Sequence, residues 1–129
     1  MGFPVWFPTA LGFFKLTQVA LNWVAEGAYA GVAQGMMAFQ LGGAAFAHTI
    51  AEKPDGKPLL AKNAPVAMFF CTTVAIKALS GESILTTVLL HAALAAAGFA
   101  SGYAILAMGP GGAAEAMSPV KWKKKRGFD

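Results

Sequence analysis

Charged side chains are scarce in this sequence, and two long stretches have none. Asp, Glu, Lys and Arg make up 12% of the 129 residues, whereas hydrophobic residues make up 57%. Residues 27–51 and 83–114 contain no charged residue. A helix needs roughly 20 apolar residues to cross the core of a bilayer, and both stretches are longer. With a mean hydropathy of +0.56, the composition predicts an integral membrane protein and argues against a water-soluble domain.

Cysteine and recognisable catalytic patterns are also scarce. Cys71 is the single cysteine, so no internal disulfide can form, and its apolar surroundings favour a small hydrophobic role. The sequence shows no phosphate-binding loop, no paired catalytic carboxylates, no serine–histidine–acid set and no Cys/His cluster with metal-ligand spacing. These absences argue against an enzyme that acts alone.

Four hydrophobic segments predict an all-α integral membrane bundle of three to four transmembrane helices. No linker divides the chain, so residues 1–129 are expected to form one membrane domain. The proline- and glycine-rich stretch 52–58 marks a solvated turn between the second and third segments. The four helices are expected at residues 8–25, 27–50, 64–79 and 83–108, with Pro65 in the opening turn of the third and Ser80 or Ser83 capping the fourth.

The first segment has a polar face. Lys15, Gln18, Asn22 and Glu26 recur at spacings of three or four residues and share one side of a helix. This pattern fits a transmembrane helix whose polar face packs inside a bundle, and it also fits an amphipathic helix that lies along the membrane interface. Together with Gln34 and Gln40, these groups also admit a small pore or proton path.

Glycines at four-residue spacing predict two faces for helix packing. Gly27, Gly31 and Gly35 form one stripe on the second segment, and Gly98 and Gly102 form another on the fourth. In lipid, small residues on one face allow another helix backbone to approach closely. Both stripes therefore predict contacts with neighbouring helices.

The distribution of basic residues predicts the orientation. With four spans, both termini and the loop around residues 51–63 fall on one side of the membrane. Three lysines of that loop and five basic residues of the C-terminal tail share this side, against Lys77 alone on the other. The positive-inside rule then places both termini on the cytoplasmic, stromal or matrix side of a bacterial inner membrane or an organelle membrane.

The tail, residues 117–129, combines basic and aromatic side chains that suit an anionic lipid surface or a partner protein. Each basic residue near such a surface contributes about 1 kcal/mol. A cluster that only sets the topology is an equal alternative, and nucleic-acid binding is disfavoured for a membrane protein. The residues concerned are Lys121, Trp122, Lys123, Lys124, Lys125 and Arg126.

Two histidines, His48 and His91, are the candidates for binding a cofactor, because neutral imidazole is a common ligand of haem iron and of other metals. His91 lies about 12 Å into the fourth segment and His48 lies near the opposite surface. This separation disfavours a haem held by both. A chlorophyll needs one axial ligand, which His91 with its alanine-rich flank could supply. The alternative is a histidine hydrogen-bonded to a neighbouring helix.

Three stretches resemble the DoxX-like family of small four-helix membrane proteins. Leu11–Leu21 is similar to that family's Leu-Gly-then-apolar helix, Leu41–His48 to its Gly-Ala-x-x-x-His helix end, and Ala64–Phe70 to its proline-initiated helix. The resemblance covers about Leu11–Leu79. It implies a four-helix membrane fold and, since some members are subunits of quinone-linked oxidoreductases, a quinone-linked role in which His48 is the matching polar position.

These observations favour a non-catalytic accessory subunit of a larger bioenergetic membrane complex, of photosystem or respiratory type. Its expected partners are membrane lipids and other integral membrane subunits, with no nucleic acid. The alternatives are a DoxX-like quinone-linked redox subunit and a small transporter that uses Glu26.

Overall fold

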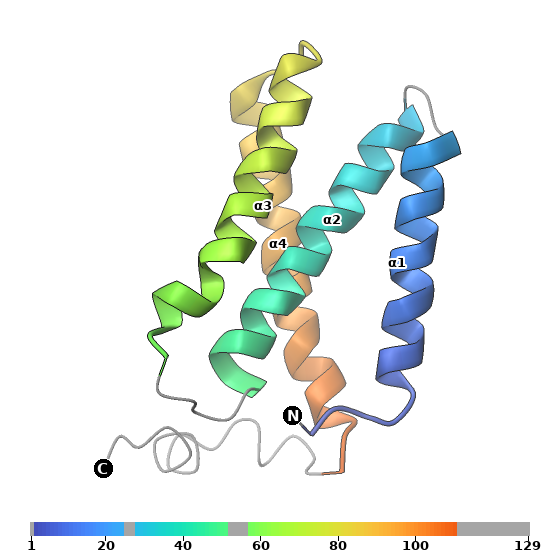
Figure 1. The fold of residues 1–129 in the computed structure, drawn as a ribbon, viewed down its shortest axis with the longest axis vertical. Coiled ribbons are helices and arrows are strands. Elements are labelled where there is room, and N and C mark those ends of the chain that lie inside the picture. The colour runs from blue at the N-terminus through green and yellow to red at the C-terminus, as the bar shows by residue number, and fades with distance from the viewer. Residues whose placement is uncertain (1, 25–27, 52–56, 111–129) are drawn as a thin grey trace.

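The regular structure of the described residues is entirely helical. The computed structural model describes residues 2–24, 28–51 and 57–110 (Figure 1). This confirms the predicted all-α class for the described part of the chain. In chain order, its elements are α1 (Phe7–Val24), α2 (Ala28–Phe46), the short π-helix η1 (Ala47–Ala51), α3 (Leu59–Leu79) and α4 (Ile84–Ala107).

The helices run alternately up and down. The start of α1, the end of η1, the start of α3 and the end of α4 all lie at the lower end in Figure 1. The N-terminal segment reaches the end of α4, since a Cβ atom on Gly109 would lie 1.9 Å from the carbonyl oxygen of Gly2. We call this the N-terminal end of the bundle, and the opposite one, which holds the α3–α4 turn, the far end.

Helices α2 and α4 form the closest pair, and they touch backbone to backbone. A Cβ atom on Gly42 would lie 1.8 Å from the carbonyl oxygen of Ala95, and one on Gly98 would lie 1.9 Å from that of Phe39. Only glycine permits this approach. Helix α2 also contacts α1 and α3, and the buried apolar residues lie on it and on η1, namely Ala33, Ala38, Leu41, Phe46 and Ala51.

Polarity is inverted relative to a water-soluble protein. Large apolar side chains point outward, with Trp23 90%, Leu79 89% and Leu60 83% exposed. Polar side chains are buried instead, namely Gln18, Thr73, Thr87 and His91. A soluble monomer of this size does not expose so much contiguous apolar surface. The outer surface therefore suits an apolar environment.

Among the described helices, α3 and α4 are long and apolar enough to cross a membrane, with mean hydropathies of 1.5 and 1.8 in their most apolar stretches. A soluble protein can contain such a helix in its core, where most of its residues are buried. Here only 6% of that stretch of α3 and 17% of that of α4 are buried. Both helices thus present their apolar side chains outward.

The third helix begins five residues earlier than the sequence predicts. It starts at Leu59, directly after Pro58, whose φ of −57° suits a helix entry. Pro65 consequently lies inside the helix and cannot bond the carbonyl oxygen of Ala61. Because Ala61 is exposed, that oxygen is not enclosed by the bundle, which lowers the cost of the proline.

The other helix ends lie closer to the prediction. Helices α1 and α4 end within one residue of the expected bounds, and Ser83 caps α4 by accepting a hydrogen bond from the backbone N–H of Thr86. The α-helical part of the second segment ends at Phe46, because the last turns widen into the π-helix η1.

Candidate functional site

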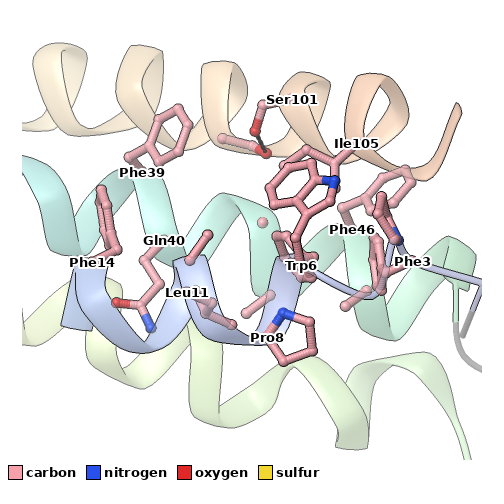
Figure 2. A pocket seen from close by; sticks show the side chains of 18 of the residues that line it. Phe3, Trp6, Pro8, Leu11, Phe14, Phe39, Gln40, Phe46, Ser101 and Ile105 are labelled. Carbon is pink, nitrogen blue, oxygen red and sulfur yellow. Dashed lines mark hydrogen bonds between the residues drawn. The ribbon is translucent and has the colours of Figure 1, made fainter. Parts of the chain in front are cut away.

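A cavity of about 850 Å³ lies between α1, α2 and α4 at the N-terminal end of the bundle (Figure 2). Its walls come from segments far apart in the sequence, so no single sequence motif predicts it. A volume of this size accommodates a typical small ligand. Six aromatic side chains line it: Phe3, Trp6, Phe7, Phe14, Phe39 and Phe46.

Aromatic pairs close the two ends of this cavity. At one end the rings of Phe14 and Phe39 lie 6.2 Å apart between centroids. At the other, Phe3 stacks on Phe7 at 4.7 Å and lies 6.5 Å from Phe46. Since Phe39 and Phe46 are seven residues apart on α2, the cavity extends over about 10 Å at 1.5 Å per residue.

The floor of the cavity is the crossing of α2 and α4, where side chains are small. Gly43, Gly98 and Gly102 contribute no side chain to the lining, and the Ser101 hydroxyl donates to the carbonyl oxygen of Gly98 at 2.8 Å. Phe46 covers Gly102 so closely that a Cβ atom there would lie 2.3 Å from its ring. The floor is therefore flat and its serine hydroxyl is already bonded.

The polar side chains of the lining all offer N–H or O–H donors, and those of Gln40, His48 and Ser101 can also accept. Lys15 and Gln40 adjoin Phe14 and Phe39 in the sequence and so share one end of the cavity, while His48 lies in η1 toward the other. π-helical turns occur frequently at functional sites. Among the described residues, no carboxylate lines the cavity.

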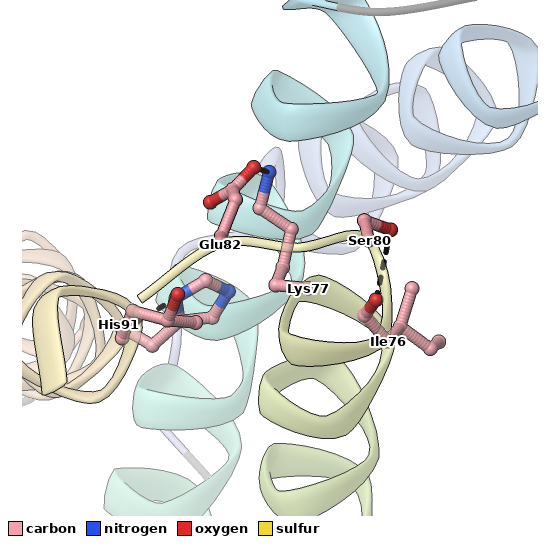
Figure 3. A network of polar contacts seen from close by, with 6 residues as sticks. Ile76, Lys77, Ser80, Glu82 and His91 are labelled. Carbon is pink, nitrogen blue, oxygen red and sulfur yellow. Dashed lines mark hydrogen bonds and ion pairs between the residues drawn. The ribbon is translucent and has the colours of Figure 1, made fainter. Parts of the chain in front are cut away.

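His91 lies in a second polar cluster, in the far half of the bundle (Figure 3). Its side chain is 2% exposed, and its Nδ1 lies 2.9 Å from the carbonyl oxygen of Thr87. A carbonyl accepts only, so Nδ1 carries the proton and Nε2 holds a lone pair. Neither that Nε2 nor the Thr87 hydroxyl has a hydrogen-bond partner within the described residues. The ring of Phe70 stands edge-on, 6.4 Å away.

The structure does not bring the two histidines together. His91 is the eighth residue of α4, toward the far end, whereas His48 follows the end of α2 at the N-terminal end. His48 is half-buried and lines the cavity. His91 is enclosed, so a pigment ring could reach its Nε2 only if the surrounding helices moved apart.

The glycine stripes face other helices of the same chain. A Cβ atom on Gly31 would lie 3.3 Å from the ammonium nitrogen of Lys77, and one on Gly35 would lie 3.3 Å from a methyl group of Leu94. Gly98 and Gly102 face α2, as described above. Gly27 and all the tail residues singled out in 117–129 lie outside the described residues.

The side chain of Lys77 extends from α3 to the surface of α2 at Gly31. Its ammonium group forms an ion pair with Glu82 in the α3–α4 turn (Figure 3). Its side chain is 16% exposed and that of Glu82 is 49% exposed. The pair thus ties α2, α3 and the α3–α4 turn together at the far end.

The polar face of α1 docks onto α2. Asn22 donates to the backbone carbonyl of Gln18 at 2.8 Å and accepts a hydrogen bond from the Gln34 amide at 3.4 Å. Gln18 is 5% exposed. Gln18 therefore packs inside the bundle, and Asn22 reaches Gln34 from an exposed position. Lys15 is exposed and borders the cavity, and Glu26 lies outside the described residues.

Comparisons with protein-family models, with curated proteins and with solved structures found no match. The likeness to the DoxX-like family is neither supported nor refuted by them.

Proposed function

We propose that this protein is a non-catalytic accessory subunit that packs inside a larger bioenergetic membrane complex, of photosystem or respiratory type. One observation carries the proposal: the described chain exposes its large apolar side chains and buries its polar ones. In water this surface would aggregate, whereas in lipid or against other membrane subunits it is stable.

Four spans follow from the same proposal. Helices α3 and α4 have the composition of transmembrane helices, and α1 and α2 run beside them as part of one bundle (Figure 1). The N-terminal end then faces the cytoplasm, stroma or matrix, because Lys57 and Lys62 lie there together with the last residues of α4.

The surface for other subunits is the outer side of α3. The described glycines of the two stripes, Gly31, Gly35, Gly98 and Gly102, already face other helices of the same chain and are not free to bind partners. Within the described chain, α3 buries Thr73 alone and exposes Met68 by 71% and Phe69 by 58%. Side chains of this size on an uncovered helix provide the van der Waals contact that membrane helices use to associate.

Co-migration after extraction in mild detergent tests the proposal. We expect the tagged protein to run with a large complex on a native gel. The double change Met68→Ala and Phe69→Ala should release it, whereas Phe13→Ala, at an equally exposed position on α1 (68%), should not. A monodisperse protein that never co-migrates with a complex would overturn the assignment.

Pigment binding remains a prediction within this proposal. If His48 or His91 ligates a chlorophyll, the purified complex should absorb in the red, and replacing the ligating histidine by alanine should remove that band. A complex that keeps its full absorbance in both variants excludes these histidines as ligands.

A second candidate is a quinone-linked redox subunit, which one observation favours: His48 lies in a π-helical turn on the wall of the aromatic cavity. It requires quinone-dependent electron transfer with a soluble partner that is lost in His48→Ala. A small transporter is the third. It requires a proton or ion flux in liposomes that Glu26→Gln reduces, and no described residue supports it specifically.

A further inference from the structure

We infer that the cavity between α1, α2 and α4 binds a lipid-soluble carboxylic acid of the medium-chain fatty acid class, since about 10 Å holds roughly eight to ten carbons of an extended chain. Its carboxylate lies at the Lys15–Gln40 end, and its chain runs between the aromatic rings toward Phe3 and Phe46. This inference rests on the membrane placement proposed above but not on any particular partner complex.

The position of Lys15 along α1 favours an anionic ligand. Lys15 is the ninth of the 18 residues of α1, so in a spanning helix it lies near the middle of the bilayer. An ammonium group at that depth is costly unless it is paired, and intramembrane charges therefore mark functional sites with a partner.

The chain offers Lys15 no such partner among its described residues. Glu82 is the one acidic residue in the described ranges, it lies in the α3–α4 turn, and it is paired with Lys77. The other polar groups of the cavity lining, including the amide of Gln40, have N–H or O–H donors and no negative charge. Charge complementarity therefore selects an anion, and a carboxylate would accept from both Lys15 and Gln40.

The shape of the cavity selects the rest of the ligand. Aromatic rings and bare glycine backbone leave an apolar space about 10 Å long, with room for one chain above the floor formed by Gly43, Gly98 and Gly102. A neutral ring compound such as a quinone would fill this space without using the charge of Lys15. A single chain with one acidic group uses both features.

Quenching of tryptophan fluorescence provides a direct test. The chain contains three tryptophans, and Trp6 lines the cavity. In a Trp23→Phe, Trp122→Phe background, Trp6 is the single reporter. The protein is placed in nanodiscs of neutral phosphatidylcholine and titrated with decanoic acid brominated in mid-chain, or with its methyl ester, which has the same chain without the charge.

We expect saturable quenching by the acid and only the linear background of membrane partition by the ester. Lys15→Gln should weaken binding of the acid at least about tenfold, while Lys15→Arg should retain it and Lys57→Gln, outside the cavity, should leave it unchanged. Ala10→Phe, which fills the cavity from α1, should abolish the saturable component.

Equal quenching by acid and ester in the protein that carries only the two tryptophan substitutions would overturn the inference. This comparison does not depend on whether the Lys15→Gln variant inserts into the nanodisc. Displacement of the brominated acid by a neutral quinone or by phosphatidate but not by unbrominated decanoate would also overturn it, since these outcomes assign the cavity to a quinone or a phospholipid. The proposed membrane role is judged separately, by insertion into the nanodisc and by co-migration with a complex.

Discussion

Gly98 of α4 lies directly against the backbone carbonyl of Phe39 on α2, which a Cβ atom on Gly98 would approach to 1.9 Å. The two helices cross here without any side chain between them. This close approach fixes the core of the bundle, and it also leaves the bare backbone that forms part of the cavity floor. Stability and cavity shape thus depend on the same glycine.

Gly98→Ala should therefore destabilise the protein more than its single added methyl group suggests. The contact is with rigid backbone, so α2 and α4 must separate, at a cost of about 1–3 kcal/mol or more. Gly43→Ala is the matched control, because its Cβ atom would lie at an ordinary 3.7 Å from the carbonyl oxygen of Gly98. Thermal unfolding in detergent should show a clear drop for the first variant and little change for the second.

The sequence predicted the helices well because lipid-compatible helices need long runs without charge. The uncharged run that begins at Ser83 predicted the approximate bounds of α4, and of the two predicted caps, Ser80 and Ser83, the structure shows Ser83. The predicted start of α3 at residue 64 was wrong, because it assumed that Pro65 lies in the first turn, where proline is common. Here Pro58 already provides the entry, and the exposed first turns tolerate the second proline.

The cavity could not be predicted, because its rings come from separate segments whose contact depends on tertiary packing. Phe14 and Phe39 belong to different helices, and nothing in their local sequence indicates that they meet. Gly42 was missed for a related reason. It makes the tightest approach to α4 but lacks a glycine four residues away, so the spacing rule that singled out Gly31 and Gly35 passed over it.

Asn22→Leu should weaken the docking of α1 onto α2. The change removes the acceptor of the Gln34 amide, and hydrogen bonds between membrane helices contribute about 0.6 kcal/mol on average. Thr17→Val is the control, since the hydroxyl of Thr17 bonds to Phe13 of its own helix. We expect a small loss of stability in chemical unfolding for the first variant only. Equal effects would mean that the bond between helices contributes nothing specific.

Substitutions at His91 should separate packing from ligand binding. His91→Leu removes a buried Nε2 that lacks a hydrogen-bond partner among the described residues, so stability should be unchanged or higher. His91→Ala leaves a cavity and should cost about 2 kcal/mol or more. Thermal unfolding measures both. If His91→Leu is instead as damaging as His91→Ala, the imidazole makes a contact beyond packing, such as one with a bound cofactor.

The ion pair at the far end should contribute little to stability. Glu82 is 49% exposed, and exposed pairs contribute about 0–1 kcal/mol because solvent screens them. Glu82→Gln should therefore lower the unfolding free energy by less than about 1 kcal/mol, and high salt should remove the difference. A larger, salt-insensitive loss would show that Lys77 requires this partner in order to pack against Gly31.

The single cysteine provides a test of the membrane placement of α3. Cys71 is exposed on the bundle surface and is the thirteenth of the 21 residues of α3, about 18 Å from Leu59 and 12 Å from Leu79. If α3 spans the bilayer, this thiol faces hydrocarbon, which a charged reagent does not enter. A charged maleimide should leave Cys71 unlabelled in intact membranes and label it after denaturation.

Two variants in a Cys71→Ser background calibrate the assay and determine the orientation. Ser80→Cys should react from one side of the membrane, and Lys57→Cys from the other, the cytoplasmic, stromal or matrix side. Labelling of Cys71 in intact membranes as fast as that of Ser80→Cys would show that α3 lies outside the hydrocarbon core, and labelling of both loop variants from one side would exclude a spanning α3.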